Sequence, residues 1–225
     1  MKIIDAHTHI DYISHKHQDD VFESICCTTD ESQWIDLVNI IKNDNAVYGA
    51  FGIHPWYVDS VKPEFDERLE ELLLDNDSYM VGEIGLDKYK PYLDKQINVF
   101  EKQLKVAVKL HRVVFLHCVG AWDKVLNILK QYKKSDLPIL VVHDFHGSTE
   151  ILDFLLNNYN VMFSFNNINK PEYIKQIPDD KIMVESDGKK DVILFDVIKK
   201  IENIKHNENI GDIIYNNTQR ILKNG

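Results

Sequence analysis

Short apolar runs rich in β-branched residues recur along the chain, and amphipathic segments separate them. The runs predict eight strands, near residues 2–6, 24–29, 46–53, 79–84, 112–117, 138–143, 160–165 and 181–186. Several are apolar throughout, which is typical of parallel strands covered on both faces of a sheet. The pattern therefore favours an α/β fold built on a buried parallel sheet.

The segments between the runs carry apolar residues three and four positions apart, as one face of a helix does. This spacing predicts helices over residues 34–41, 65–73, 97–108, 122–132 and 194–201, with weaker signals over 149–156 and 171–177 and a closing helix over 210–222. Eight strands alternating with helices favour a closed (β/α)8 barrel over an open doubly wound sheet. Because no linker-like tract interrupts the alternation, we expect residues 1–225 to form a single domain.

Imidazole and carboxylate side chains stand at the ends of the apolar runs, or just beyond them. The C-terminal ends of parallel strands lie on one side of a barrel, and this is where such folds place their chemistry. The pattern therefore predicts one converging metal site, with the candidate ligands His7, His9, Glu83, His117, His143 and Asp187.

The residue types at these positions suit metal binding. His7 and His9 are two positions apart on a strand, so both point to one side of the pleat and can chelate one ion. Glu83 is a carboxylate that can bridge two ions, and Asp187 can bind a metal and accept a proton from water. Each assignment has an alternative. The two histidines can instead be polar residues that satisfy the end of a strand, and Glu83 can instead form an ion pair with Lys88. Glu185 fits a buried ion pair as well as it fits a functional role.

Two further histidines are candidates for substrate binding. Pro55 restricts His54 to an extended backbone, which should direct the imidazole towards the mouth of the barrel. We predict that His54 contacts a substrate phosphate or supports the site, rather than binding a metal directly. His146 follows the sixth strand and is either a substrate contact or an ordinary loop residue.

Composition narrows the classes of function. The hydrophobic content of 44% and charged content of 28% are those of a soluble globular protein. The net charge of −10 and the lack of a long basic run argue against broad electrostatic capture of a nucleic-acid backbone. A phosphate-bearing substrate must then be held locally, which bound divalent cations can do. Motifs for covalent serine catalysis, nucleotide phosphate loops and dinucleotide binding are absent from the sequence.

The location and assembly are predicted from weaker signals. No apolar run approaches the roughly 20 residues that a membrane span requires, and the N-terminus has no signal-peptide pattern. Three cysteines, two of them adjacent in an apolar run, suit reduced thiols in the cytoplasm. No protein partner is indicated, and we expect a monomer.

The ordered strand-end motifs resemble those of the TatD-related hydrolases. They are Asp5-Ala6-His7-Thr8-His9, Gly52-Ile53-His54-Pro55, Gly82-Glu83-Ile84-Gly85-Leu86-Asp87 and Glu185-Ser186-Asp187, together with the strand-end His117 and His143 and the helical Gln96, Phe100, Gln103 and Leu104. The resemblance spans essentially the whole chain. It implies an amidohydrolase-type barrel that uses two divalent ions (Mg²⁺, Mn²⁺ or Zn²⁺) to hydrolyse phosphodiesters, often as a deoxyribonuclease.

The resemblance also implies a role for each ligand. His7, His9, Glu83 and Asp187 would hold one ion, and Glu83 would bridge to a second ion bound by His117 and His143. Glu83 and Asp187 would be the catalytic residues, with Asp187 handling the proton. The expected substrate is DNA or a small phosphodiester.

The chain differs from the family pattern in its loops. The barrel is somewhat shortened, and Gly188-Lys189-Lys190-Asp191 replaces a longer loop after the last strand. We therefore expect the parts that grip substrate to be reduced. Two other functions remain open: a barrel hydrolase acting on an amide, lactone or phosphomonoester, and a scaffold that keeps a metal for structure without turnover.

Overall fold

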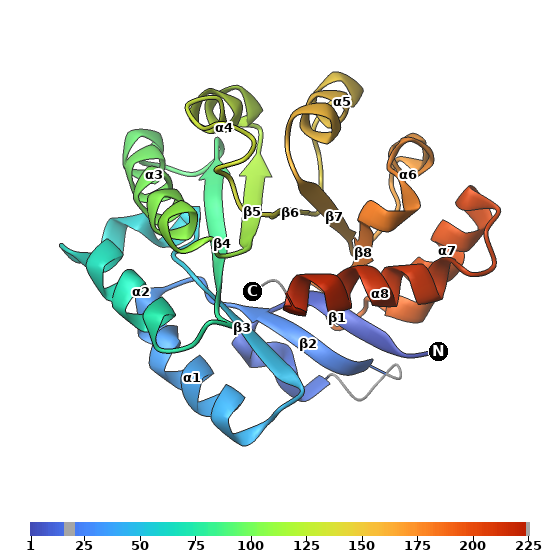
Figure 1. Cartoon of the computed structure of the whole chain (residues 1–225), viewed down its shortest axis with the longest axis horizontal. Coiled ribbons are helices and arrows are strands. Elements are labelled where there is room, and N and C mark those ends of the chain that lie inside the picture. Colours follow the sequence, from blue (N-terminus) through green and yellow to red (C-terminus); the bar gives the residue numbers. More distant parts are fainter. Residues whose placement is uncertain (16–20, 224–225) are drawn as a thin grey trace.

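The computed structural model describes residues 1–15 and 21–223 and contains one parallel sheet whose strand order follows the sequence (Figure 1). Its strands are β1 (Ile3–Thr8), β2 (Val21–Cys27), β3 (Val47–Phe51), β4 (Met80–Asp87), β5 (Val114–Val119), β6 (Leu140–His143), β7 (Val161–Phe165) and β8 (Ile182–Val184). Each strand pairs in parallel with the next along the chain. The eight strands form a nearly closed barrel, which confirms the predicted fold class.

The seam of the barrel lies between its first and last strands. There the backbone N–H of Asp187 donates to the carbonyl of His7 at 2.9 Å. The N–H of Ser186 donates to Asp5 Oδ1 at 2.8 Å. Both bonds involve residues at or beside the predicted metal site, so closing the sheet and assembling the site depend on the same contacts.

The helices surround the sheet, except that the last one lies across the barrel (Figure 1). They are α1 (Trp34–Asn43), α2 (Phe65–Leu74), α3 (Leu93–Leu110), α4 (Trp122–Leu129), α5 (Thr149–Asn158), α6 (Pro171–Gln176), α7 (Leu194–Lys205) and α8 (Ile210–Lys223). Short 3₁₀ helices add η1 (Ile10–His15), η2 (Glu31–Gln33), η3 (Pro55–Ser60) and η4 (Asp179–Lys181). All eight predicted helices are present. Within the described residues, none is both long enough and apolar enough to cross a membrane.

Some strand limits differ from the predicted ones by a few residues. The second strand begins earlier than expected, because Val21 already pairs with Ile3 of β1. The fourth strand continues to Asp87, because Leu86 and Asp87 pair with β5. Pairing with a neighbouring strand sets these limits, and the local sequence does not reveal it.

Two apolar layers fill the structure. The larger layer lies between the sheet and the helices. The smaller one takes at least one residue from every strand, with Ile221 of α8 added, and comprises Ala6, Ile25, Cys27, Ala50, Met80, Val113, Phe115, Val141, Met162, Met183 and Ile221. Phe115 and Val141 stand two positions before His117 and His143, so they share a strand face with those imidazoles. This inner layer therefore forms the floor beneath the predicted site.

Two buried glutamines of α3 hold the ends of neighbouring strands. Gln103 accepts from the Ile53 N–H (2.7 Å) and donates to the Ile53 carbonyl (3.1 Å). Gln96 accepts from the Asp87 N–H (2.9 Å) and donates to the Asp87 carbonyl (3.1 Å). Backbone groups where β3 and β4 end are thereby satisfied without water, and the segments that carry the site are held in place.

Replacing Gln103 by leucine should lower the free energy of unfolding by about 2–4 kcal/mol, because two buried backbone groups of Ile53 lose their partner. Chemical denaturation followed by circular dichroism measures this change. Gln131→Leu is the matched control, since Gln131 is exposed in the turn after α4. Equal stabilities of the two variants would contradict the role given to Gln103.

Candidate metal centre

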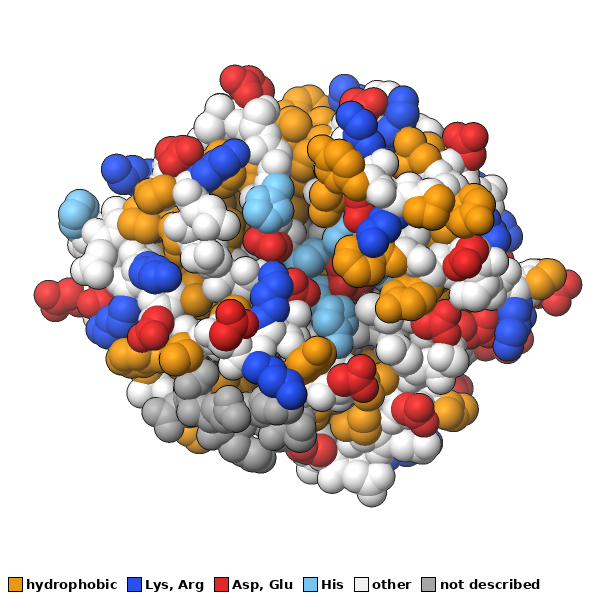
Figure 2. Space-filling view, turned by 180° about the vertical axis from the view of Figure 1, so that it is seen from behind, with side chains coloured by type: hydrophobic (Ala, Val, Ile, Leu, Met, Phe, Trp, Pro, Cys, Tyr) orange, Lys and Arg blue, Asp and Glu red, His pale blue; other side chains and the backbone are white. Residues whose placement is uncertain are grey.

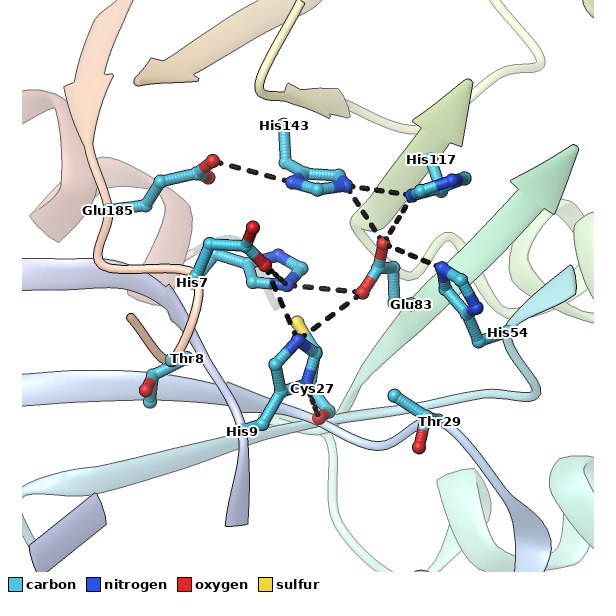
Figure 3. A network of polar contacts seen from close by, with 12 residues as sticks. His7, Thr8, His9, Cys27, Thr29, His54, Glu83, His117, His143 and Glu185 are labelled. Carbon is cyan, nitrogen blue, oxygen red and sulfur yellow. Dashed lines mark hydrogen bonds and ion pairs between the residues drawn. The ribbon is translucent and has the colours of Figure 1, made fainter. Parts of the chain in front are cut away.

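The structure brings all six predicted ligands together at the C-terminal ends of the strands, with His54 among them. Figure 3 labels His54 and every one of these ligands except Asp187. Glu83, on β4, lies at the centre of this group. Its carboxylate is only 2% exposed. Each of its two oxygen atoms faces a different set of imidazoles.

The Oε2 atom of Glu83 faces β1. It lies 3.2 Å from His7 Nε2 and 3.7 Å from His9 Nε2. The Oδ1 atom of Asp187 lies 3.8 Å and 3.5 Å from the same two nitrogens. Two imidazoles and two carboxylates therefore converge, as predicted for a first ion.

The Oε1 atom of Glu83 faces β5 and β6. It lies 2.7 Å from His117 Nδ1 and 2.8 Å from His143 Nε2. His54 Nε2 is also close, at 3.3 Å. His54 thus stands among the candidate ligands themselves, nearer to Glu83 than the sequence suggested.

The donor set suits a cation. Nitrogen and oxygen donors of His54, Glu83 and His117 lie within 4.8 Å of one another, and the same holds for His7, His9 and Glu83. His7 is fully buried, yet neither of its ring nitrogens has a hydrogen-bond partner among the described residues. Buried polar atoms are normally satisfied, so a cation near Nε2 would supply the missing partner. Imidazole and carboxylate together suit Zn²⁺ and Mn²⁺.

Further contacts orient two imidazoles through the ring nitrogen that faces away from Glu83. Glu185, which the sequence left open, is fully buried and has Oε1 3.3 Å from His143 Nδ1. Its other oxygen accepts a hydrogen bond from Ser164. His9 Nδ1 lies 3.0 Å from the Cys27 carbonyl. Such partners fix the orientation of an imidazole that binds metal through its other nitrogen.

Close approach of β4 to β5 brings Glu83 to His117. A Cβ atom at Gly82 would lie 2.5 Å from the Phe115 Cβ, so only glycine fits. At Gly85, φ is +148° and a Cβ would lie 1.9 Å from the His117 carbonyl oxygen. The Gly82–Glu83 peptide bond is cis.

The charges of the cluster compensate one another. Burial opposes ionisation of Glu83, but the imidazolium of His143 overcomes it, and the pKa of Glu83 is well below its usual value. Burial likewise opposes protonation of His143, but Glu83 and Glu185 raise its pKa well above the usual value. The two groups therefore form a buried ion pair. A cation bound to Glu83 would replace the proton of His143 as the compensating charge.

Burial also acts on the pKa values of His54, Asp5 and Asp187. It lowers the pKa of His54 to about 4, so this imidazole is neutral at pH 7. Its Nδ1 accepts the Trp56 backbone N–H at 3.2 Å, which leaves the ring proton on Nε2, facing Glu83. Burial raises the pKa of Asp5 to about 7. Burial also disfavours ionisation of Asp187, but the hydrogen bond with His9 outweighs this effect and lowers the pKa of Asp187.

The cluster lies in a cleft of about 550 Å³ that is open to solvent. Figure 2 looks onto this face and shows histidine and acidic side chains at the bottom of a hollow, with lysine and hydrophobic side chains at its edge. The walls include Tyr12, Trp56, Tyr57, Lys189 and Lys190. No pattern in the sequence pointed to these three aromatic residues, although Trp56 and Tyr57 directly follow His54-Pro55.

The loop after β8 supplies positive charge to the cleft. Lys189 Nζ lies 2.8 Å from Asp187 Oδ2 and 3.8 Å from Asp144 Oδ2. His146, the second predicted substrate contact, is half exposed and pairs with Asp144 at 3.3 Å. It lines a smaller neighbouring pocket with Phe145 instead of the cleft of the metal centre.

Known proteins with similar sequences include nucleases and hydrolases. The 3'-5' RNA nuclease TATDN2 of Homo sapiens is 30% identical over 172 residues, which cover 72% of this chain and 22% of that protein. The uncharacterized metal-dependent hydrolase YabD of Bacillus subtilis (strain 168) is 28% identical over 158 residues, which cover 67% of this chain and 62% of YabD. The chain thus spans less than two thirds of the length of either relative.

Solved structures share the fold along nearly the full chain. The TatD homologue YJJV of Escherichia coli K12 superposes with a TM-score of 0.86 at 22% identity, covering 97% of both chains. A TatD family hydrolase of Entamoeba histolytica gives 0.80 at 17% identity, again over 97% of both chains. A family model described as TatD related DNase matches residues 4–223. The match confirms the resemblance of the strand-end motifs, and the chain belongs to the TatD related DNase family.

Proposed function

We propose that the protein is a metal-dependent phosphodiesterase that hydrolyses nucleic-acid strands. The observation that carries this proposal is the position of Glu83, whose Oε2 faces His7 at 3.2 Å while its Oε1 faces His117 at 2.7 Å. One carboxylate shared by two imidazole sets suits a pair of cations, as in phosphatases and nucleases. The named relatives add support: TATDN2 is a 3'-5' RNA nuclease, and TatD of Rahnella sp. (strain Y9602), 30% identical over 150 residues, is a 3'-5' ssDNA/RNA exonuclease.

Two divalent ions, Mg²⁺, Mn²⁺ or Zn²⁺, are proposed for the centre. The first would be held by His7, His9, Glu83 and Asp187, and the second by Glu83, His117 and His143. When bound, such ions lower the pKa of water and neutralise charge on a phosphodiester. His54 is neutral, and its Nδ1 accepts the Trp56 N–H, so its Nε2–H, 3.3 Å from Glu83, can donate to a phosphate oxygen.

Asp187 is placed to accept the proton of the attacking water. Its Oδ1 lies 3.5 Å from His9 Nε2 and its Oδ2 lies 2.8 Å from Lys189 Nζ, so the carboxylate is held from both sides. As the water oxygen bonds to phosphorus, the bond from phosphorus to one sugar oxygen breaks and that oxygen takes up a proton. The products are a phosphomonoester and an alcohol.

The charge of the chain fits a substrate that is captured locally. The net charge is −10, yet the cleft contains Lys189 and Lys190 beside the cluster. Phosphate would therefore be attracted at the centre, where cations and lysines gather, and repelled elsewhere on the surface. This placement favours a substrate strand that is held through a few phosphates at the centre over a strand that is bound along its whole length.

We propose further that residues 1–225 act as one catalytic domain and that the protein works as a monomer in the cytoplasm. The unbroken order of β1 to β8 supports a single unit. Cys26, Cys27 and Cys118 are free and buried, which suits a reducing compartment. His146 is retained as a candidate contact for a part of the substrate that extends beyond the cleft.

Glu83→Gln and Asp187→Asn should each lower kcat/KM on single-stranded DNA and RNA by about 10²–10⁴-fold, because each removes a charge that acts on the reacting groups. Asp123→Asn is the control, since this aspartate is exposed on α4. The assay should compare Mg²⁺, Mn²⁺ and Zn²⁺ forms with the apoprotein, and phosphodiesters with phosphomonoesters and amides. Full activity of either variant would contradict the proposal, and faster turnover of an amide or phosphomonoester would favour another hydrolase.

Cations should stabilise the fold. Mn²⁺ or Zn²⁺ at about 100 times its Kd should add roughly 2.7 kcal/mol per site. This raises the Tm by about 5–10 °C in a domain of this size. His7→Ala should abolish most of the shift, while His146→Ala should keep it, because His146 lies outside the cluster. Calorimetric scans with and without metal measure the shift in Tm. If His7→Ala shows the same shift as wild type, His7 is not a metal ligand.

Glu185→Gln should weaken metal affinity by about 10–100-fold, because the amide no longer holds His143 as a carboxylate does. Isothermal titration with Mn²⁺ measures the change. Glu172→Gln, at an exposed position of α6, makes the same chemical change away from the centre. Equal affinities of the two variants would show that the contact of Glu185 with His143 does not support metal binding.

A further inference from the structure

A large aromatic side chain, Trp56, forms part of the cleft wall. It lies on η3, directly after His54-Pro55, and is 51% exposed. Single exposed aromatic residues are common on protein surfaces, so exposure by itself indicates no function. What distinguishes Trp56 is how its ring is held and what lies beside it.

The Trp56 ring is fixed by a buried acid. Its indole N–H donates to Asp87 Oδ2 at 2.7 Å, and Asp87 is only 3% exposed. The other oxygen of this carboxylate accepts the Tyr89 N–H at 2.9 Å, and the Asp87 backbone is held by Gln96. A charge-assisted hydrogen bond to a buried, already positioned carboxylate sets the ring plane before any ligand arrives. Such preorganisation reduces the entropy that a ligand loses on binding.

The ring is also adjacent to the chemistry. The Trp56 and His54 ring centroids are 5.3 Å apart at an interplanar angle of 78°. His54 Nε2 is in turn 3.3 Å from Glu83 Oε1. A single imidazole therefore separates the indole from the central carboxylate. Lys90 Nζ lies 3.9 Å from the indole centroid, which places a positive charge over one face of the ring.

We propose that Trp56 is a stacking platform for an unpaired nucleobase of the strand whose phosphodiester lies at the metal centre. The inference rests on the proposed function and specifies how the substrate is recognised. Every base has a flat π-face, so a tryptophan binds bases with little regard to sequence. Bases inside a duplex are already stacked on their neighbours, so the platform favours single strands. Lys90, Lys189 and Lys190 would supply charge to the phosphates around the bound nucleotide.

This platform accounts for features that metal binding leaves unexplained. A site that only held cations and a phosphate would not need a half-exposed indole anchored to Asp87. Tyr57 adds a second aromatic ring to the same wall, 6.4 Å from the His54 ring. The wall after β3 thus offers aromatic surface, whereas the loop after β8 offers Lys189 and Lys190. A nucleotide presents the matching pair of groups, a base and a phosphate.

Two single-stranded DNA oligonucleotides of equal length test the proposal, one with all its bases and one abasic throughout. With the Mn²⁺-loaded protein, Trp56→Ala should lower kcat/KM on the intact strand by about 5–150-fold, the equivalent of about 1–3 kcal/mol per stacked base. The loss should appear mainly in KM. On the abasic strand Trp56→Ala and wild type should be equal. Trp56→Phe, which keeps a ring but loses the N–H, should retain most of the activity on the intact strand.

Phe195→Ala is the control, because Phe195 is 43% exposed on α7 and does not line the cleft. It should match wild type on both strands. An equal loss on intact and abasic strands in Trp56→Ala would overturn the proposal, since Trp56 would then act through His54 or the fold. No loss on either strand would overturn it as well.

Binding of the same two strands, measured by fluorescence anisotropy, separates this inference from the proposed function. A preference for the intact strand that disappears in Trp56→Ala supports the platform whether or not the strand is cut. If the strand binds in this way without being cleaved, the proposed phosphodiesterase function fails and the platform stands. If both strands are cleaved and bound without any preference that depends on Trp56, the platform fails alone.

Discussion

A buried carboxylate surrounded by imidazoles is the constraint on which the rest of this structure depends. Glu83 is nearly inaccessible to solvent, and an isolated charge there would be strongly unfavourable. Its two oxygens are compensated separately, one by the histidines of β1 and one by those of β5 and β6. Such an arrangement requires the strand ends to be positioned to within about 0.5 Å.

The barrel provides this precision because the contacts that close it also build the site. The N–H of Asp187 bonds to the carbonyl of His7 across the seam, so a residue of the cluster takes part in joining β8 to β1. Close packing at Gly82 and Gly85 brings β4 against β5. Gln103 fixes the chain where β3 ends. The same contacts therefore stabilise the fold and set the geometry of the centre.

The surroundings of the centre fit the proposed action of this acidic protein on an acidic polymer. With a net charge of −10, the surface does not attract a polyanion at long range. Positive charge instead gathers in and beside the cleft: Lys189 in the cleft pairs with Asp187, and Lys90 lies over one face of the Trp56 ring. The recognition proposed for this cleft would depend on the few groups around one nucleotide. The short loop after β8 is thus compatible with phosphate binding, because it still delivers lysines to the cleft.

The sequence by itself determined the barrel, the order of its elements and the candidate ligands. Apolar runs and helical spacing are local patterns, and the position of His117 or His143 at the end of a run follows from the alternation of residues along a strand. Strand limits were less accurate, because pairing with a neighbour decides where β2 starts and β4 ends.

Only the tertiary structure decided how the loops meet the centre. It placed His54 against Glu83, directed His146 to a neighbouring pocket, paired Lys189 with Asp187 and anchored Trp56 on Asp87. These contacts join residues from different loops, and their geometry depends on the path of each loop and the rotamer of each side chain. Neither is encoded in a local repeat. The ligands could therefore be predicted from the pattern of residues, but the residues that form the walls of the cleft could not.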